Sequence, residues 1–96
     1  MITLPLALAL LRSILPELKK KYPISSMNIF GSVARGDQRP DSDLDILVEF
    51  SGPIGWEFID LADEIEAVAG VSVDLVSSNG IKTSYREQIR KDLVRV

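Results

Sequence analysis

The chain has 96 residues, of which 46% are hydrophobic and 26% are charged, and its formal net charge is −3; this size and composition predict one folded domain over residues 1–96 with a single small core. Cys and His are absent, which excludes disulfides, thiolate or imidazole metal sites, and catalysis by a Ser-His-Asp triad. No apolar run approaches the roughly 20 residues of a membrane helix and no signal peptide is recognisable, so we expect a cytoplasmic protein that binds no membrane.

The N-terminal segment has the leucine spacing of a helix. The leucines that recur at steps of four and three residues are Leu4, Leu8, Leu11, Leu15 and Leu18. This period predicts a helix that ends at the basic run 19–21. Pro16 lacks a backbone donor, so we expect a kink or a restart of the helix after Ser13. The apolar-rich segment 24–30 then predicts a strand that ends at Gly31.

The middle of the chain predicts a short helix, a turn and a strand. Residues 32–37 predict the helix, with Ser32 near its N-cap, and residues 39–42 predict the turn. Residues 43–50 alternate cleanly, which predicts a strand with one buried face. Its apolar face holds Leu44, Ile46, Val48 and Phe50, and its other face holds Asp43, Asp45, Leu47 and Glu49.

The C-terminal part predicts two more helices with a strand between them. An apolar stripe predicts a helix that ends at Gly70, and this stripe consists of Phe58, Leu61, Ile65 and Val68. Residues 71–76 predict a strand with Asp74 on its polar face. A weaker helix follows, with Tyr85, Ile89 and Leu93 on its apolar side.

The order of these elements predicts the fold class. Helices and strands alternate along the chain, which indicates an α/β (α+β) sandwich. We expect the helices to pack on one face of a small mixed sheet. The other face would then be free to hold a site.

Acidic residues gather in the middle of the chain. Ten of the 14 acidic residues lie within residues 41–74, which contain no Lys or Arg, and the flanks hold all 11 basic residues. This segregation favours a cation or a basic partner near the middle. A solvated helix face explains the acids of residues 57–66, but it does not explain Asp41, Asp43, Asp45 and Asp74.

The run from Gly31 to Asp45 combines a candidate phosphate site with candidate metal ligands. Gly31-Ser32, at the end of a strand, offers backbone N–H groups and a hydroxyl to an anion such as phosphate. Asp43 and Asp45 leave the same face of a strand, where their charges repel unless a cation lies between them. Carboxylate oxygens suit Mg²⁺, which also takes phosphate oxygens from substrates. If the strand with Asp74 is adjacent, three carboxylates converge beside the phosphate site in the layout of two-metal phosphoryl or nucleotidyl transfer.

Either half of this pattern is common by itself. Most Asp-x-Asp pairs are turn or capping residues, and a Gly-Ser pair is ordinary turn chemistry. The combination of strand, cradle, helix and paired acids within 15 residues is what favours a functional site.

The same residues carry a resemblance to a known family. Gly31-Ser32, ten residues, and then Asp43-x-Asp45 resembles the signature of the polymerase-β-type nucleotidyltransferase superfamily. The fuller string, with Phe30 and with Ala34-Arg35-Gly36, resembles the minimal nucleotidyltransferase (MNT) family over essentially the whole chain. The resemblance implies the polymerase-β-like nucleotidyltransferase fold and an enzyme that uses Mg²⁺ and ATP.

The resemblance also implies roles for single residues. Gly31 and Ser32 would bind the β and γ phosphates of a nucleoside triphosphate. Asp43 and Asp45 would ligate Mg²⁺. Asp74 would complete the metal site and assist deprotonation of the acceptor hydroxyl, which attacks the α phosphate and expels pyrophosphate.

Two roles for Arg35 stay open with equal weight. Its guanidinium would either support the triphosphate or pair structurally with an acid such as Asp41.

Family members of this size are similar to antitoxins of HEPN/MNT toxin–antitoxin pairs. This implies that AMP passes from ATP to a tyrosine of a partner HEPN ribonuclease toxin inside a heteromeric complex. No direct nucleic-acid partner is expected, because the only basic cluster, residues 19–21, suits a helix C-terminus.

Two alternatives to catalysis on a toxin stay open. One is a non-catalytic subunit that neutralises its partner sterically, with Trp56, Ile59 and Tyr85 as candidate contacts. The other is nucleotidyl transfer to a small molecule or an RNA end, for which relatives usually carry a further domain.

Overall fold

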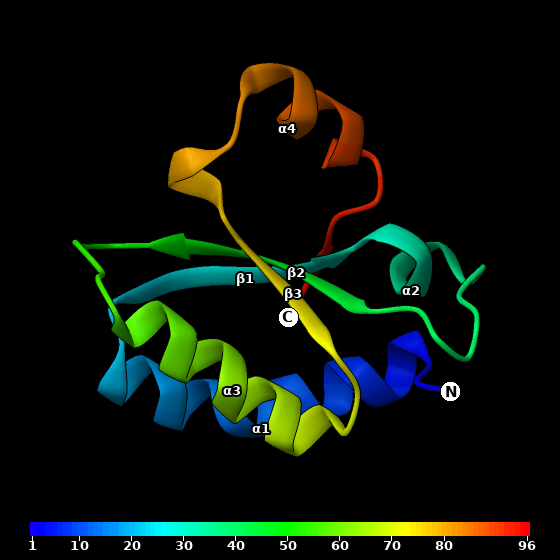
Figure 1. Ribbon diagram of the computed structural model, residues 1–96, viewed down its shortest axis with the longest axis horizontal. Coiled ribbons are helices and arrows are strands. Elements are labelled where there is room, and N and C mark those ends of the chain that lie inside the picture. Colours follow the sequence, from blue (N-terminus) through cyan, green and yellow to red (C-terminus); the bar gives the residue numbers. More distant parts are fainter.

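A computed structural model describes residues 1–96 and is built around one four-stranded mixed sheet (Figure 1). The strands are β1 (Ile24–Phe30), β2 (Leu44–Phe50), β3 (Val73–Ser77) and β4 (Val94–Arg95). They follow the order β3-β2-β1-β4; β1 pairs antiparallel with β2 and β4, whereas β2 and β3 are parallel. The predicted fold class, an α/β (α+β) domain with a small mixed sheet, is therefore confirmed.

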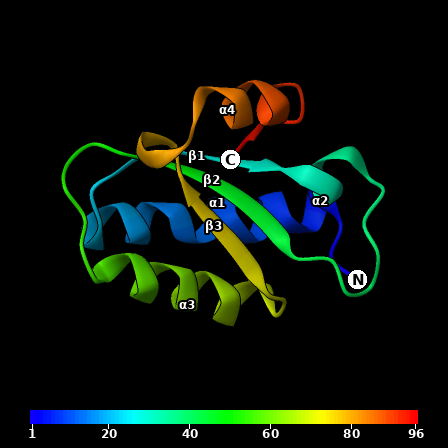
Figure 2. The same ribbon diagram turned by 45° about the horizontal axis from the view of Figure 1, so that its top comes forward.

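Two long helices cover one face of the sheet (Figures 1 and 2). They are α1 (Leu4–Lys21) and α3 (Glu57–Ala69). Their apolar stripes and the alternate residues of β1 and β2 form the main core, where burial of apolar surface supplies most of the stability. Its fully buried large side chains include Leu11, Ile29, Ile46, Leu61 and Ile65. The predicted apolar face of residues 43–50 is thus the face that points to the helices.

Helix α1 runs past Pro16 without interruption, so the restart predicted after Ser13 does not occur. Pro16 is exposed, and a backbone carbonyl that loses its helical partner on the solvent side can bind water instead. Thr3 caps the first turn, because its hydroxyl oxygen accepts from the N–H of Leu6 at 3.4 Å.

Helix α4 (Thr83–Arg90) lies on the opposite face of the sheet (Figure 1). Its Ile89 packs against Phe30 of β1 and Leu47 of β2 in a second, smaller cluster of buried side chains. The expectation that the helices pack on one face holds for α1 and α3 and needs correction for α4. The apolar residues Phe30 and Leu47 on the otherwise polar face are the physical reason, because they require a cover.

The short helix α2 (Gly31–Arg35) follows β1 directly. It begins at Gly31, and its N-cap is Phe30 without any side-chain capping bond. Ser32, predicted near the N-cap, is the second residue of the helix and does not cap it. The turn at residues 39–42 is present as predicted. There the N–H of Ser42 donates to the carbonyl of Arg39 at 3.0 Å, and the hydroxyl of Ser42 accepts from the N–H of Arg39 at 2.8 Å.

Helix α3 connects the parallel strands β2 and β3. It ends at Gly70, which has a φ of 71°, as predicted from the position of this glycine. The Glu66 carboxylate accepts from the N–H of Val73 at 2.9 Å and so joins the end of α3 to the start of β3. A 3-10 turn (Ser78–Gly80) then leads to α4. None of the helices is both long enough and apolar enough to cross a membrane.

Candidate active site

Two of the predicted acids meet on adjacent parallel strands. Asp45 of β2 and Asp74 of β3 are register partners, so their side chains leave the same face of the sheet. Asp43 lies two residues before Asp45 in the exposed segment that leads into β2, and its charge acts on Asp45. The strand pairing that a three-carboxylate site requires is therefore present. We call the region formed by Asp43, Asp45 and Asp74 the acid edge.

The carboxyl group of Asp45 is perturbed by its surroundings. Partial burial, followed by the negative charges of Asp74 and Asp43, raises the pKa of Asp45 to about 6, and the opposing charge of Arg35 only partly offsets this rise. Burial acts because an ionised carboxylate loses hydration, and the neighbouring charges act because they disfavour a further negative charge. A cation placed at the acid edge would relieve both effects.

Gly31 is packed directly against Asp45. Gly31 has a φ of +75°, which side chains rarely adopt, and a Cβ atom at this position would overlap Oδ2 of Asp45. The approach is close because β1 ends at Phe30, the register partner of Asp45. Ser32 follows on α2 and is partly exposed. The turn from β1 into α2 therefore brings the predicted phosphate-binding pair next to the acid edge.

Arg35 is held by two carboxylates, neither of which is the one expected. Its Nε lies 3.2 Å from Oδ2 of Asp37, and its Nη1 lies 2.8 Å from Oδ2 of Asp92. Hydrogen bonds to Asp37 and then to Asp92 raise the pKa of Arg35. Arg35 is thus an ion-pair partner, as one of its two predicted roles states, but not with Asp41. Its charge also acts on Asp45, so it remains within electrostatic reach of the acid edge.

A concavity of about 340 Å³ opens beside Gly31 and Arg35. Tyr85 of α4 and Lys91, which follows α4, also line this concavity. Lys91 was not a predicted site residue, because the sequence does not show which face of the sheet α4 covers. Tyr85, Gln88 and Lys91 all line this concavity and follow one another at steps of three residues. This helical spacing is the signal in the sequence that could have placed the three on one side of α4.

Tyr85 stands at the acid edge. Its ring packs edge-to-face against Phe30, with ring centroids 6.4 Å apart. Burial, followed by the charges of Asp74 and Asp45, raises the pKa of the Tyr85 phenol. The other two candidate contact residues, Trp56 and Ile59, lie at the start of α3 in the helical layer and are 85% and 53% exposed. The three therefore do not form one surface.

The acid edge has the chemistry of a site for a hard cation, although it is not closed around one. No group of three acidic side chains lies as it stands in an arrangement that would hold a metal ion. The donors are all carboxylate oxygens, Asp45 and Asp74 are neighbours, and ionisation of Asp45 is disfavoured without a positive charge nearby. Binding of Mg²⁺ would therefore require side-chain rotations that bring these oxygens together.

Comparison with known proteins shows which class of protein this chain belongs to. Residues 11–96 match a family model described as a nucleotidyltransferase domain. With the mixed sheet and the acid edge in place, the chain is a nucleotidyltransferase by fold and by family.

Relatives of similar length place it more narrowly. A protein of Methanocaldococcus jannaschii provisionally named a protein adenylyltransferase is 44% identical over 81 residues, which are 82% of this chain and 83% of that protein. The protein adenylyltransferase MntA of Thermococcus cleftensis is 36% identical over 81 residues, with 83% and 82% coverage.

Solved structures agree with this placement. One described provisionally as a minimal nucleotidyltransferase has a TM-score of 0.83 and 34% identity, with 99% of this chain and 97% of that chain covered. A chain of a toxin–antitoxin complex with AMP-PNP has a TM-score of 0.69 and 25% identity, with 92% and 67% covered. The chain belongs to the minimal nucleotidyltransferase family.

Proposed function

We propose that this chain is the antitoxin of a HEPN/MNT toxin–antitoxin pair and acts as a Mg²⁺-dependent protein adenylyltransferase. It transfers AMP from ATP to a tyrosine of its HEPN ribonuclease partner and releases pyrophosphate. The juxtaposition of Asp45 and Asp74 beside Gly31 carries this proposal. Relatives named as protein adenylyltransferases and the likeness to a toxin–antitoxin complex with AMP-PNP support it.

The phosphate side of the site is built by the turn from β1 into α2. Gly31 lacks a side chain, so its backbone packs directly against Asp45, where a Cβ atom would overlap the carboxylate. β and γ phosphates bound to the N–H groups of this turn would therefore lie beside the acid edge. Ser32 adds a hydroxyl to the same turn. Arg35, which is 46% exposed, keeps part of its guanidinium free to act on the triphosphate while Asp92 orients it.

The acid edge carries the reacting groups. Asp43, Asp45 and Asp74 would hold Mg²⁺, which when bound neutralises the charge of the phosphates. Asp74, which is exposed, accepts the proton of the acceptor hydroxyl. The hydroxyl oxygen forms a bond to the α phosphorus, the bond from this phosphorus to the bridging oxygen breaks, and pyrophosphate leaves with that electron pair.

The acceptor side of the site is open. Asp43 and Asp74 are both exposed, and no element of this chain covers them. A reaction that needs water excluded from the reacting atoms therefore needs another surface. A partner protein can supply this surface together with the acceptor tyrosine.

Transfer of label tests the proposal. The chain is incubated with ATP labelled at the α phosphate, Mg²⁺ and its HEPN partner, and the partner is then analysed for label. We expect label on the partner with the native chain, and none with Asp43→Asn or Asp45→Asn. Asp63→Asn, at an exposed acid of α3, should transfer normally. An unlabelled partner after incubation with the native chain would contradict adenylyl transfer to it.

The exposure of Trp56 and Ile59 favours steric neutralisation as the second candidate function. A variant in which Asp43, Asp45 and Asp74 are all replaced by Asn separates the two candidates. Adenylyl transfer predicts that this variant no longer protects cells from the toxin, whereas steric neutralisation predicts full protection.

A further inference from the structure

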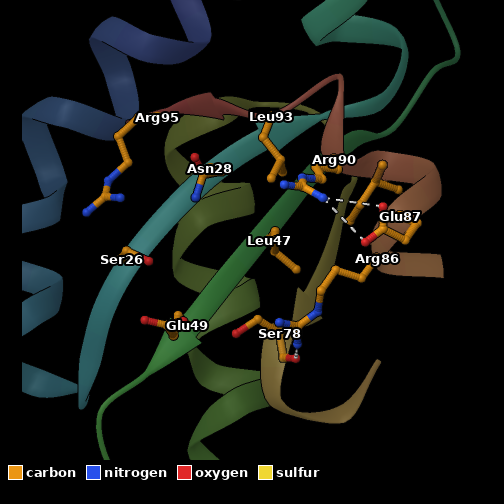
Figure 3. Close-up of a pocket in the computed structure, with 11 residues that line it drawn as sticks. Ser26, Asn28, Leu47, Glu49, Ser78, Arg86, Glu87, Arg90, Leu93 and Arg95 are labelled. Atoms are coloured by element: carbon orange, nitrogen blue, oxygen red, sulfur yellow. Dashed lines mark hydrogen bonds and ion pairs between the residues drawn. The ribbon is translucent and has the colours of Figure 1, made fainter. Parts of the chain in front are cut away.

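A second concavity lies between α4 and the sheet (Figure 3). It takes Arg86, Glu87 and Arg90 from α4, whereas the concavity beside Gly31 takes Tyr85 and Gln88. Its volume is about 380 Å³, and Ile89 is the only residue that it shares with the concavity beside Gly31. Its apolar floor consists of Leu47, Ile89 and Leu93. We call it the arginine pocket, because its polar walls include Arg86, Arg90 and Arg95.

The arginines on α4 are not neutralised by close carboxylates. Arg86 and Arg90 are one helical turn apart and both line the pocket (Figure 3). Arg86 donates from Nη2 to the carbonyl of Ser78 at 2.5 Å. Nη1 of Arg90 lies 3.5 Å from the Glu87 carboxylate, and these side chains are 72% and 61% exposed. Such a long, exposed pair contributes little, so both guanidinium groups keep most of their charge available.

The arginine pocket is a positively charged hollow on an acidic molecule. Three arginines line it with two glutamates, Glu49 and Glu87, whereas the whole chain has a net charge of −3. Ser26 and Asn28 of β1 add neutral hydrogen-bonding groups. The planar fork of an arginine binds a carboxylate through two parallel hydrogen bonds. The apolar floor suits the methylene groups of an acidic side chain.

We propose that the arginine pocket binds an acidic segment of the protein acceptor, so that the acceptor contacts both sides of α4. This inference rests on the proposed function, because it assigns a second anchor to the protein whose tyrosine enters the acid edge. A nucleic acid fits this face less well, because two glutamates lie among the three arginines of the pocket, whereas a phosphate backbone binds best along an extended basic surface. The anchor would position the acceptor without touching the reacting atoms.

Charge reversal tests the role of the pocket. We expect Arg90→Glu to weaken binding of the HEPN partner by about tenfold and to raise the KM for the partner, because a favourable charge pair becomes repulsive. Arg90→Lys, which keeps the positive charge but loses the planar fork, should bind more weakly than the native chain and more tightly than Arg90→Glu. Affinity for AMP-PNP with Mg²⁺, measured by calorimetry, should stay at the native value. The matched control is Lys19→Glu, an equal charge change at an exposed position of α1 in the helical layer.

The other outcomes are decisive as well. Native affinity of Arg90→Glu for the partner would overturn the inference, and so would an equal loss of AMP-PNP binding, which would assign the pocket to the nucleotide. Loss of binding to an RNA oligonucleotide, with partner binding intact, would also overturn it in favour of nucleic acid. Failure of the native chain to bind the partner, with AMP-PNP bound, would instead contradict the proposed function.

Discussion

At the scale of single residues, the perturbed carboxyl of Asp45 links stability to function. Burial and the charges of Asp74 and Asp43 raise its pKa to about 6. The folded chain therefore holds the Asp45 proton more tightly than the unfolded chain does. The resulting contribution to stability is complete below about pH 4 and is lost as the pH rises through about 6. At neutral pH the ionised side chain destabilises the fold, a cost that functional groups commonly impose.

Asp45→Asn should therefore stabilise the metal-free protein at pH 7. We expect the free energy of unfolding to rise by about 1 kcal/mol, less than the full shift implies because solvent screens the half-buried carboxylate. Urea unfolding at several pH values in the presence of a chelator measures this gain. It should disappear below pH 4, where Asp45 is protonated in both states. If the variant and the native chain were equally stable at pH 7, burial and charge repulsion would not be the origin of the raised pKa of Asp45.

Gly31 and Gly36 form a matched pair for testing the packing against Asp45. Both have positive φ angles, +75° and +83°, but a Cβ atom would overlap Asp45 only at Gly31, since nothing lies within 4 Å at Gly36. We expect Gly36→Ala to cost about 1 kcal/mol of stability, and Gly31→Ala about 2–3 kcal/mol together with loss of adenylyl transfer. Chemical unfolding and the label assay measure both. Equal costs at the two positions would show that the contact is unimportant.

At the scale of elements, α4 is held by few apolar contacts. The main core joins α1, α3 and the sheet, whereas α4 rests on the small cluster of Phe30, Leu47 and Ile89. One ion pair from Arg35 joins α2 to Asp92, just after α4. An element with a small apolar anchor opens more readily than the rest of a domain. Both concavities of the open face are walled by α4, so its position shapes the whole site.

Ile89→Ala should release α4 without unfolding the domain. We expect amide hydrogen exchange to accelerate in residues 83–90 while α1 and α3 stay protected, because the removed contacts belong to the small cluster only. The control is Ile65→Ala in the main core, which should accelerate exchange in every element. Uniform acceleration by Ile89→Ala would show that α4 unfolds together with the main core.

The elements also show where prediction from sequence ends. The alternation of residues 43–50 was sufficient to separate the core face of β2 from the face that carries Asp45. The stripe from Tyr85 to Leu93 predicted a helix but not the face of the sheet that this helix covers. Phe30 and Leu47 determine that face, and they lie on strands that are far from the helix in the sequence. β4 has only two residues, which is too short for any pattern. Asp92 as the partner of Arg35 depends on a contact across 57 residues.

At the scale of the whole molecule, the chain divides its surface into different environments. Helices α1 and α3 lie on one face of the sheet and α4 lies on the other (Figure 2). Residues of α4 line the arginine pocket, whereas the acid edge lies where Asp45 of β2 pairs with Asp74 of β3. The acids concentrated in residues 41–74 predicted a cation or a basic partner at the middle of the chain. Three arginines of the basic C-terminal flank, Arg86, Arg90 and Arg95, line the arginine pocket. This arrangement depends on the fold and cannot be read from the linear sequence.

The central claim is that Asp43, Asp45 and Asp74 form one metal site beside a triphosphate-binding turn. The most direct measurement is a crystal structure of the chain with AMP-PNP and Mg²⁺. Our account predicts an ion in contact with all three carboxylates, with the β and γ phosphates against Gly31 and Ser32. A nucleotide bound elsewhere, with the three carboxylates free of metal, would contradict it.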